Sequence, residues 1–219
     1  MRQDRLMADA PEHPIFARFY DRMFDSIEKA GLAEMRAELL SEARGRTLEL
    51  GAGTGLNLPH YTDSVTALVL TEPDPHMATR LRARLQREGA PAGIDAGVDE
   101  ASAEELPYDD GSFDTVVSTL VLCTVPDPAR ALAEVRRVLA PGGLLIFVEH
   151  VRAEGGVRAW MQDRLERPWG FFAGGCHPNR PTGELLGDAG LRVERLDRGA
   201  LPKAGPLIKP LVTGVATRP

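Results

Sequence analysis

The sequence predicts an α/β fold built on one mainly parallel β-sheet, and three observations lead to this prediction. Short apolar segments typical of buried strands alternate with amphipathic helical segments along the chain. A glycine-rich turn at 51–55 follows the first of these strands, and a Pro-Gly-Gly stop at 141–143 follows a later helix. Strands that alternate with helices pair in parallel through right-handed crossovers. We therefore expect helices on both faces of a single sheet.

Length and composition limit the kind of protein. The 219 residues suit a single domain over 1–219 with a sizeable core. A net charge of −6 with interspersed signs argues against a nucleic-acid partner. Cys123 and Cys176 are too few for a disulfide framework, and they fit a reducing cytoplasm. Since no apolar run approaches the ~20 residues that span a bilayer, we expect a cytoplasmic protein without a membrane anchor.

The N-terminal part predicts two helices before the first strand. Residues 1–14 are polar, and we expect them to be flexible. Apolar positions then recur at helical spacing over 15–43, and Gly31 separates two helices there. The first strand is predicted at 46–50.

The middle of the chain continues the alternation. An apolar run at 67–70, which ends at the turn residues 71–73, predicts the second strand. The Arg-rich segment 77–88 has amphipathic helical spacing, and 94–98 carries a weak third strand. The long run at 113–122 is rich in β-branched residues and predicts the fourth strand together with the loop after it.

The last third of the chain completes the sheet. Asp114 begins a buried strand, where an acid usually makes local backbone hydrogen bonds, so we interpret it as structural. A helix at 128–139 is closed by the stop at 141–143, and the fifth strand follows at 144–149. The segments after it are a mostly helical or irregular stretch at 156–190 and two closing strands at 191–197 and 211–217.

The turn at LELGAGTG (48–55) carries the main functional signal. Gly51, Gly53 and Gly55 remove side chains where a backbone must approach a ligand or take a positive φ. A turn between a strand and a helix is where α/β sheets bind nucleotides. Glu49 would repel a dinucleotide's pyrophosphate but would attract the ammonium and sulfonium of S-adenosylmethionine. The GxGxG spacing, in place of GxGxxG, also favours S-adenosylmethionine as the cofactor.

Two further positions belong to the same prediction. Glu72 lies at the end of the second strand, ~20 residues past the turn, where an acid accepts hydrogen bonds from both ribose hydroxyls. The alternative is a surface acid before Pro73. Met77 is either a side chain packed on adenine or an ordinary helix-core methionine, because methionine fills apolar gaps of both kinds.

Several ordered motifs resemble class I S-adenosylmethionine-dependent methyltransferases of small molecules, a group that includes the quinone-ring methylases. The resemblance covers about 15–200 and rests on LELGAGTG, TEPDPHM (71–77) and the segment 101–150. That family has a Rossmann-like seven-stranded sheet with a reversed final hairpin. NLPHY, STLVLCTV, EVRRVLAPGG and EHV are similar to a subgroup that includes membrane-associated alkyl-thiol methyltransferases of animals. Because residues 1–14 are polar, we do not expect the membrane association of that subgroup to carry over.

The resemblance also implies roles for individual residues. Tyr20 falls where relatives close a lid, although its spacing equally suits a core aromatic. Many relatives have Asp at the position of Ser102. The implied cofactor contacts are Glu49, Gly51, Ala52, Gly53 and Gly55 with the methionine part, Glu72 and Pro73 with the ribose, Ser102, Ala103 and Glu104 with adenine, and Thr119 and Leu120 near the sulfur.

The acceptor side is less well marked. His150 follows the fifth strand, where it is either a catalytic or substrate contact or a packed, hydrogen-bonded histidine. Cys176 and His177 have a spacing that suits no metal site, so the sequence predicts no metal. The segment 156–182 is an insert that would form an acceptor pocket or only a local core, through its aromatic residues Trp160, Trp169, Phe171 and Phe172.

These features predict a methyltransferase that aligns a small-molecule acceptor with the methyl group and excludes water. A thiol acceptor needs little help from a base at neutral pH, because its unperturbed pKa is ~8.5. The alternatives are a phenol, an amine or a quinone precursor as the acceptor. A nicotinamide-dependent oxidoreductase and a non-catalytic cofactor-binding protein are more distant alternatives.

Overall fold

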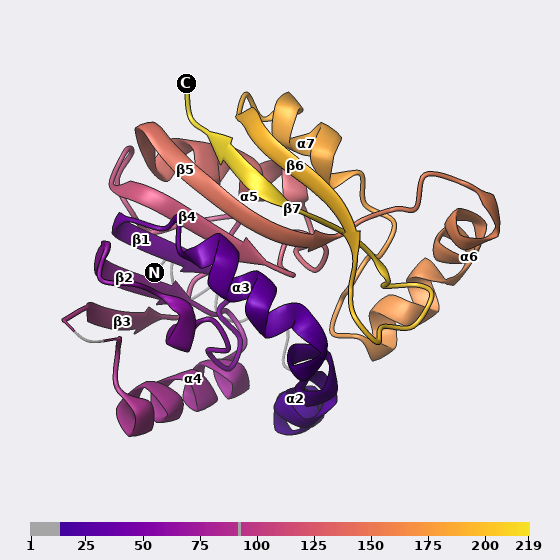
Figure 1. Ribbon diagram of the computed structural model, residues 1–219, viewed down its shortest axis with the longest axis horizontal. Helices are drawn as coiled ribbons and strands as arrows, with labels where there is room; N and C mark the ends of the chain where they lie inside the picture. The colour runs from indigo at the N-terminus through magenta and orange to yellow at the C-terminus, as the bar shows by residue number, and fades with distance from the viewer. Residues whose placement is uncertain (1–13, 92) are drawn as a thin grey trace, which may run out of the picture.

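A computed structural model describes residues 14–91 and 93–219, so the prediction for residues 1–14 falls outside the described part except at Pro14 (Figure 1). These residues form a seven-stranded sheet in the order β3-β2-β1-β4-β5-β7-β6. Neighbouring strands are parallel up to β5, and β7 runs antiparallel to both β5 and β6. The predicted Rossmann-like sheet with an antiparallel final strand is confirmed.

The elements lie close to their predicted positions. The strands are β1 (Gly45–Leu50), β2 (Val65–Thr71), β3 (Asp95–Asp99), β4 (Phe113–Thr119), β5 (Leu139–His150), β6 (Arg192–Ala200) and β7 (Pro210–Thr217). The helices are α2 (Pro14–Ile27), α3 (Ala33–Leu40), α4 (Pro75–Glu88), α5 (Pro128–Val138), α6 (Gly156–Phe172) and α7 (Thr182–Asp188), with a π-helical turn η2 (Glu28–Leu32) and a 3-10 turn η3 (Leu58–His60).

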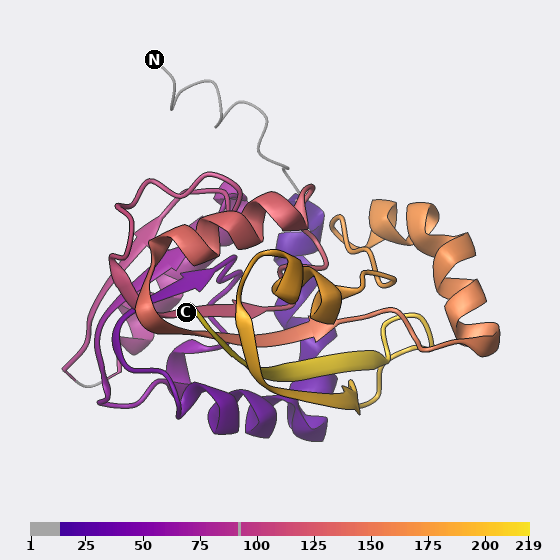
Figure 2. The same cartoon turned by 90° about the horizontal axis from the view of Figure 1, so that it is seen from above.

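Helices cover both faces of the sheet, as Figure 2 shows for α3 on one side and α5 with α7 on the other. Leu132 of α5 and Leu186 of α7 are fully buried in one apolar cluster. Leu39 of α3 and Leu81 of α4 belong to a second cluster. Burying apolar side chains on both faces is what makes the central strands nearly continuous hydrophobic runs.

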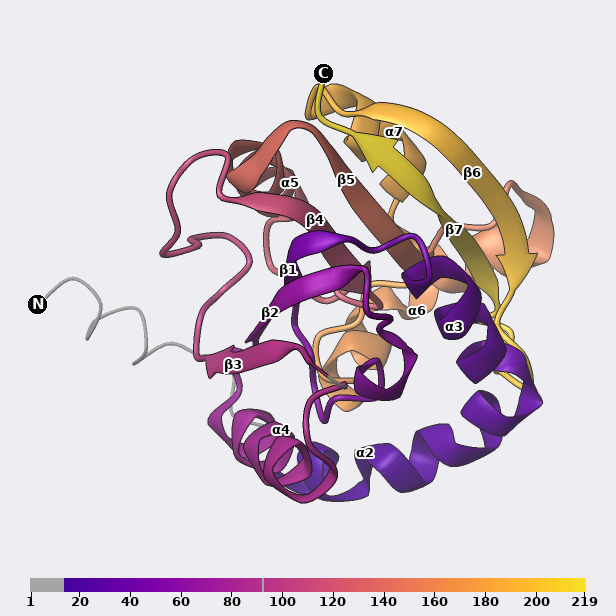
Figure 3. The ribbon, with the colours of Figure 1, turned by 60° about the vertical axis from the view of Figure 1, so that its left-hand side comes forward.

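Local signals in the sequence place the helices that flank the site. Asp74 and Asp127 cap α4 and α5, and each is followed by a proline at the first helical position. Gly31 has a φ of 132° between α2 and α3, which confirms the predicted break. As a result, α2 begins beside α4 and leads into α3 (Figure 3).

The start of β5 differs from the prediction. We expected Pro141–Gly143 to form a turn before a strand at 144–149, but β5 already begins at Leu139. Leu139 pairs with Phe113, and the backbones of Gly142 and Gly143 hydrogen-bond to Arg218. Hydrogen bonds to Arg218 therefore hold these residues in an extension of the strand. This contact is distant in sequence, so the local Pro-Gly-Gly signal does not reveal it.

Asp114 is structural, as predicted. Its carboxylate accepts a hydrogen bond of 2.8 Å from the backbone N–H of Arg46 and so joins β4 to the start of β1. The insert differs from the rest of the domain, because α6 lies beyond the end of β5 and away from both faces of the sheet (Figures 1 and 2).

Candidate active site

The candidate site lies where the strand order of the sheet reverses. There β1 pairs with β2 on one side and with β4 on the other. Open α/β sheets bind ligands beyond the carboxyl ends of the strands at such a point. A pocket in this position is lined by Tyr20, Arg36, Glu49, Gly51, Ala52, Gly53, Leu56, Asn57 and Thr119. Most of the residues predicted to contact the methionine part of the cofactor therefore lie together, with Tyr20 and Thr119 beside them.

The three glycines of the turn all have positive φ, but they serve different purposes. A Cβ atom on Gly51 would lie 2.9 Å from Val121, and one on Gly55 would lie 2.8 Å from Leu58 and Leu81. A Cβ atom on Gly53 would meet nothing closer than a backbone oxygen 4.0 Å away. Gly51 and Gly55 are therefore needed for packing, whereas Gly53 leaves open space beside the pocket.

Glu49 is buried and bound by two side chains from the segment after the turn. The Tyr61 hydroxyl donates to one carboxylate oxygen at 2.6 Å, and the Asn57 amide donates to the other at 3.0 Å. Arg36 of α3 donates to Asn57 at 2.7 Å and pairs with Glu28 at 3.0 Å. Burial raises the pKa of Glu49 to about 7.

Sequence reasoning missed Arg36, Asn57 and Tyr61. Arg36 is a nearly fully buried arginine on a helix whose sequence shows no unusual pattern. Asn57 and Tyr61 lie in NLPHY, a motif that from sequence indicates only a subgroup of the family. The sequence does offer one way to find Asn57 and Tyr61. A buried carboxylate at position 49 requires hydrogen-bond donors, and the segment that follows the glycine turn supplies them.

Glu72 fastens the end of β2 to the glycine turn. One carboxylate oxygen accepts from the backbone N–H of Gly53 at 2.8 Å, and the other accepts from that of Asp74 at 2.9 Å. Burial raises the pKa of Glu72 to about 7. The predicted juxtaposition of Glu72 with the turn is therefore present, and the surface-acid alternative does not hold because the side chain is buried.

The residues expected near adenine lie outside the lining of this pocket. Met77 is buried at the start of α4. The Ser102 hydroxyl contacts the Glu104 carboxylate at 3.1 Å, and Glu104 accepts a hydrogen bond from the backbone of Asp127. This segment is thereby joined to the beginning of α5.

α2 is docked on the glycine turn. The Thr54 hydroxyl donates to Asp21 at 2.5 Å, and Arg84 of α4 donates to the same carboxylate at 3.2 Å. Burial raises the pKa of Tyr20, and the charges of Glu72 and Cys123 add to this effect. Tyr20 lines the pocket together with Arg36 and Glu49.

A second buried carboxylate shapes that loop. Leu120 has a φ of 60° where β4 ends, an unusual value for a leucine. Glu149 of β5 accepts hydrogen bonds of 2.7 to 3.2 Å from the Ser118 hydroxyl and from the backbone N–H groups of Val121, Leu122 and Cys123. The loop that carries Cys123 is therefore held against the strand that carries His150.

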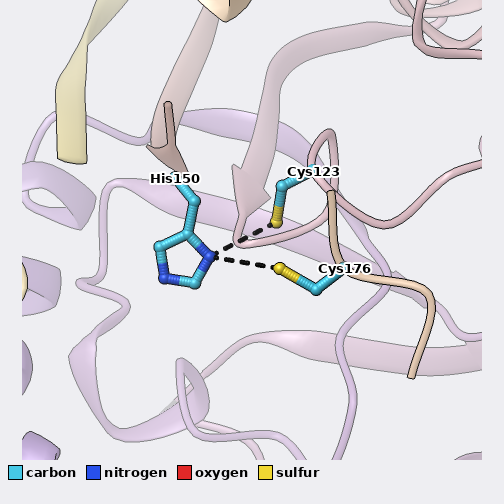
Figure 4. Close-up of side chains that lie close together, drawn as sticks. All are labelled: Cys123, His150 and Cys176. Atoms are coloured by element: carbon cyan, nitrogen blue, oxygen red, sulfur yellow. Dashed lines mark hydrogen bonds between the residues drawn. The ribbon is translucent and has the colours of Figure 1, made fainter. Parts of the chain in front are cut away.

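Cys123, His150 and Cys176 converge beside this loop (Figure 4). His150 Nδ1 lies 3.7 Å from Cys123 Sγ and 3.6 Å from Cys176 Sγ. The three residues are 1%, 4% and 6% exposed. A hydrogen bond between the two thiols lowers the pKa of Cys176 and raises that of Cys123. We call these three residues the Cys-His-Cys cluster.

The sequence did not reveal this cluster. From sequence, Cys176 and its neighbour His177 are the candidate pair. In the structure the His177 ring instead contacts Glu166 at 2.8 Å. Cys123 lies in the loop after β4, His150 ends the adjacent strand β5, and Cys176 follows α6. Only the fold brings these three segments together.

Comparison with known proteins is consistent with this geometry. Residues 48–147 match a family model described as a methyltransferase domain. The chain is 34% identical over 192 residues to the human thiol S-methyltransferase TMT1B, covering 84% of this chain and 78% of that protein. The chain belongs to the S-adenosylmethionine-dependent methyltransferases.

Two other methyltransferases illustrate the range of this family. The phosphatidylethanolamine N-methyltransferase of Cereibacter sphaeroides is 31% identical over 148 residues, covering 68% of this chain and 71% of that protein. A Thermotoga maritima crystal structure, described as a possible histamine N-methyltransferase, has a TM-score of 0.66 at 26% identity and covers 94% of this chain and 99% of that chain.

The pocket of this methyltransferase suits the cofactor that its family implies. Glu49 and Glu72 are buried carboxylates, and a ligand with an ammonium and a sulfonium would stabilise their charged forms. The open space at Gly53 permits a close approach to the backbone. Among the described residues, no helix is both long and apolar enough to cross a membrane.

Proposed function

We propose that this methyltransferase transfers a methyl group from S-adenosylmethionine to the sulfur of a small apolar thiol. The observation that carries the proposal is the similarity to a protein named as a thiol S-methyltransferase, which extends over 84% of the chain. The cofactor supplies, when bound, a methyl group that is already activated on a positively charged sulfur. The protein then has to align the acceptor and exclude water.

The cofactor roles expected from sequence form part of this proposal. Glu49 contacts the methionine part, and Glu72 accepts hydrogen bonds from the ribose. The structure adds Arg36, which lines the same pocket, to the residues around the methionine part. Thr119 and Leu120, at the end of β4, contact the region of the sulfur. The remaining contacts are Tyr20, Gly51, Ala52, Gly53 and Gly55 around the methionine part, and Pro73, Met77, Ser102, Ala103 and Glu104 around the ribose and adenine.

We propose that the acceptor approaches His150 between α2 and the insert 156–182. Trp169 lies within this insert, on the last part of α6 before Cys176. Trp160, Phe171 and Phe172 are exposed, so they do not form a core under the insert. Their apolar surfaces are available to contact an apolar acceptor.

Methylation of an amine is the second candidate, and it is favoured by the similarity to a phosphatidylethanolamine N-methyltransferase. The two acceptors differ in their need for a base. An amine with an unperturbed pKa of ~10.4 is almost wholly protonated at neutral pH, whereas a thiol of pKa ~8.5 is partly ionised. An enzyme that holds no strong base near the acceptor therefore favours the thiol.

The test is to incubate the protein with S-adenosylmethionine and a panel of alkyl thiols, aryl thiols, amines and phenols. We expect adenosylhomocysteine and the methyl thioether in equal amounts, measured by mass spectrometry. A Gly53→Val variant, which should not bind the cofactor, supplies the background rate. Turnover on amines or phenols without turnover on any thiol would refute S-methylation and leave the family assignment unchanged.

A further inference from the structure

The Cys-His-Cys cluster has the composition of a metal centre. We propose that Cys123, His150 and Cys176 bind one zinc ion, with a fourth coordination position that receives the sulfur of the acceptor. The first part, the zinc site, stands on the cluster alone, and the second part rests on the proposed function. The proposal replaces the expectation from sequence that the chain holds no metal.

The distances within the cluster suit a tetrahedral ion. Zinc binds cysteine sulfur at ~2.3 Å and histidine nitrogen at ~2.0–2.1 Å. At a tetrahedral angle these bond lengths place sulfur and nitrogen ~3.6 Å apart. The two observed separations from His150 Nδ1 are 3.7 Å to Cys123 Sγ and 3.6 Å to Cys176 Sγ. The three ligand atoms lie within 4.8 Å of one another, so a single ion between them reaches all three.

The orientation of the ring is difficult to explain without a central ion. A neutral imidazole nitrogen has one lone pair and accepts one hydrogen bond, yet both sulfurs converge on Nδ1 of His150 (Figure 4). On the other side of the ring, His150 Nε2 is buried and has no hydrogen-bond partner among residues 14–91 and 93–219. A buried nitrogen left unsatisfied in this way points to a missing ligand or ordered group.

The chemistry of the ligands selects the metal. Two thiolates and an imidazole are soft to intermediate ligands that favour zinc over magnesium or calcium. Zinc with two thiolates carries no net charge, which lowers the cost of burying the centre. The nearest buried acid, Glu149, already accepts four hydrogen bonds from the loop after β4, so it is not available as a fourth ligand.

Three protein ligands distinguish this centre from a structural zinc site. Structural sites are closed by four protein ligands, whereas catalytic sites use three and leave one position for water or substrate. Among the described residues, Cys123, His150 and Cys176 are grouped in this way without a fourth carboxylate, histidine or cysteine. An alcohol dehydrogenase site, with two cysteines and one histidine, has the same set of ligand types.

The centre lies next to the cofactor pocket. Thr119 lines that pocket, and Cys123 follows it by four residues in the loop held by Glu149. His150 ends the adjacent strand, β5, which pairs with β4. An acceptor held by an ion in the cluster would therefore lie at the same edge of the sheet as the methyl group.

The proposed step balances in atoms and charge. The acceptor thiol binds the metal as a thiolate, and its proton passes to solvent. The thiolate sulfur forms a bond to the methyl carbon as the bond from that carbon to the sulfonium breaks, and the electron pair of the broken bond remains on the leaving sulfur. The products are a neutral thioether and adenosylhomocysteine, and the metal stays in the +2 state throughout.

Zinc content tests the site itself. We expect about one zinc ion per chain in protein produced with added zinc, measured by plasma mass spectrometry after gel filtration. Cys123→Ser, Cys176→Ser and His150→Ala each remove a ligand and should weaken zinc binding at least ~100-fold. His76→Ala is the matched control, because His76 is exposed and lies on α4. Adenosylhomocysteine affinity shows whether each variant is folded.

Cobalt tests the open position without any variant. The zinc-depleted full-length protein is titrated with Co²⁺ alone, and we expect thiolate-to-cobalt charge-transfer bands together with the strong visible absorption of a tetrahedral site. Addition of an alkyl thiol, with no cofactor present, should then change the visible spectrum. Addition of the corresponding alcohol should not.

The outcomes separate this inference from the proposed function. Protein that methylates thiols but binds neither zinc nor cobalt would overturn the metal site and leave S-methylation standing. A cobalt spectrum that no thiol changes, together with methylation of amines only, would refute S-methylation and reduce the ion to a structural role. A Cys123–Cys176 disulfide in freshly purified protein, seen as a mass two hydrogens lower, would also overturn the metal site.

Discussion

The proposed cofactor side and the proposed acceptor side of this methyltransferase are built in opposite ways. The cofactor side combines a continuous turn, 51–55, with Glu72 at the end of the neighbouring strand, and Glu72 bonds directly to the backbone of Gly53. The acceptor side assembles Cys123, His150 and Cys176 from three separated segments. The first is therefore a local feature of the sequence, and the second is a product of the fold.

This difference has a chemical counterpart. The cofactor side consists of backbone groups and buried carboxylates, which suit a cationic ligand common to the whole family. The acceptor side consists of sulfur and imidazole, which suit a soft ion or a thiol. Enzymes that share a methyl donor but differ in their acceptor keep the residues around the cofactor and change those around the acceptor.

The largest expected effect comes from a substitution in the glycine turn, which should weaken cofactor binding and leave the Cys-His-Cys cluster intact. Gly53→Val places a β-branched residue at a φ of 59° and fills the open space beside the pocket. We expect adenosylhomocysteine affinity to fall more than ~100-fold by calorimetry, which corresponds to about 2.7 kcal/mol. The zinc content of the Cys-His-Cys cluster should not change, because the cluster lies on other segments.

Gly89→Val is the matched control for Gly53→Val. Gly89 has a φ of 77° at the end of α4, with no atom within 4 Å of an added Cβ. It should lower thermal stability through the same backbone strain while leaving cofactor affinity unchanged. Equal loss of affinity in both variants would show that strain, and not occupation of the pocket, explains the result at position 53.

Glu72→Ala should have the next largest effect. It releases the N–H groups of Gly53 and Asp74, and it removes the carboxylate that we propose as the acceptor for the ribose hydroxyls. Losing one charge-assisted hydrogen bond costs about 1.5–3 kcal/mol, or roughly 10- to 150-fold in affinity. Glu105→Ala, which removes an exposed ion pair with Arg130, is the control. An affinity for adenosylhomocysteine that is the same in both variants would exclude a ribose role for Glu72.

The sequence predicts the cofactor side better than the acceptor side, because the two sides depend on local and distant residues respectively. The glycine spacing, Glu49 and Glu72 are visible because their functions require neighbouring residues or the ends of adjacent strands. The sheet and its helices are visible because apolar periodicity is local. The pairing of Cys123 with Cys176 is not visible, since it depends on how α6 returns the chain to the loop after β4.

The extension of β5 and the position of Arg36 were missed for the same reason. Gly142 and Gly143 join β5 through hydrogen bonds to Arg218, which lies far away in sequence. Arg36 becomes buried only because Glu28 and Asn57 accept its hydrogen bonds. A side chain whose environment is made by distant segments carries no local signal.

Two buried carboxylates, Glu49 and Glu72, should make both the stability of the protein and its cofactor binding depend on pH. Burial raises the pKa of Glu49 and Glu72 to about 7, while Arg36 lowers the former and the N–H groups of Asp74 and Gly53 lower the latter. The folded protein therefore binds more protons than the unfolded chain between about pH 4.3 and 7, so its stability falls as pH rises through this window.

A cationic cofactor favours the ionised carboxylates, so its binding should release protons near pH 6. We expect S-adenosylmethionine affinity to rise between pH 5.5 and 7.5, by at most about tenfold per pH unit for each carboxylate. Adenosylhomocysteine lacks the sulfonium and should show a smaller rise. Binding enthalpies that are equal in phosphate and Tris buffers would mean that no protons are released.

The smallest expected effect concerns α2, the helix that is docked on the glycine turn. Because Tyr20 falls where relatives close a lid, the resemblance predicts that the helix carrying it orders over the cofactor. The structure shows Asp21 of this helix, α2, already bonded to Thr54 and Arg84. Asp21→Asn should speed hydrogen exchange across 18–27 and lower cofactor affinity only a few-fold, because partly exposed ion pairs contribute about 0–1 kcal/mol. Adenosylhomocysteine should restore the protection in this variant and add little to the native protein.

Asp25→Asn is the control for Asp21→Asn. It removes the exposed pair with Lys29 one turn further along and should leave exchange unchanged. If the two variants exchange alike, apolar contacts such as the stacked Tyr20 and Phe24 hold α2 in place, and the helix is not a lid that Asp21 controls.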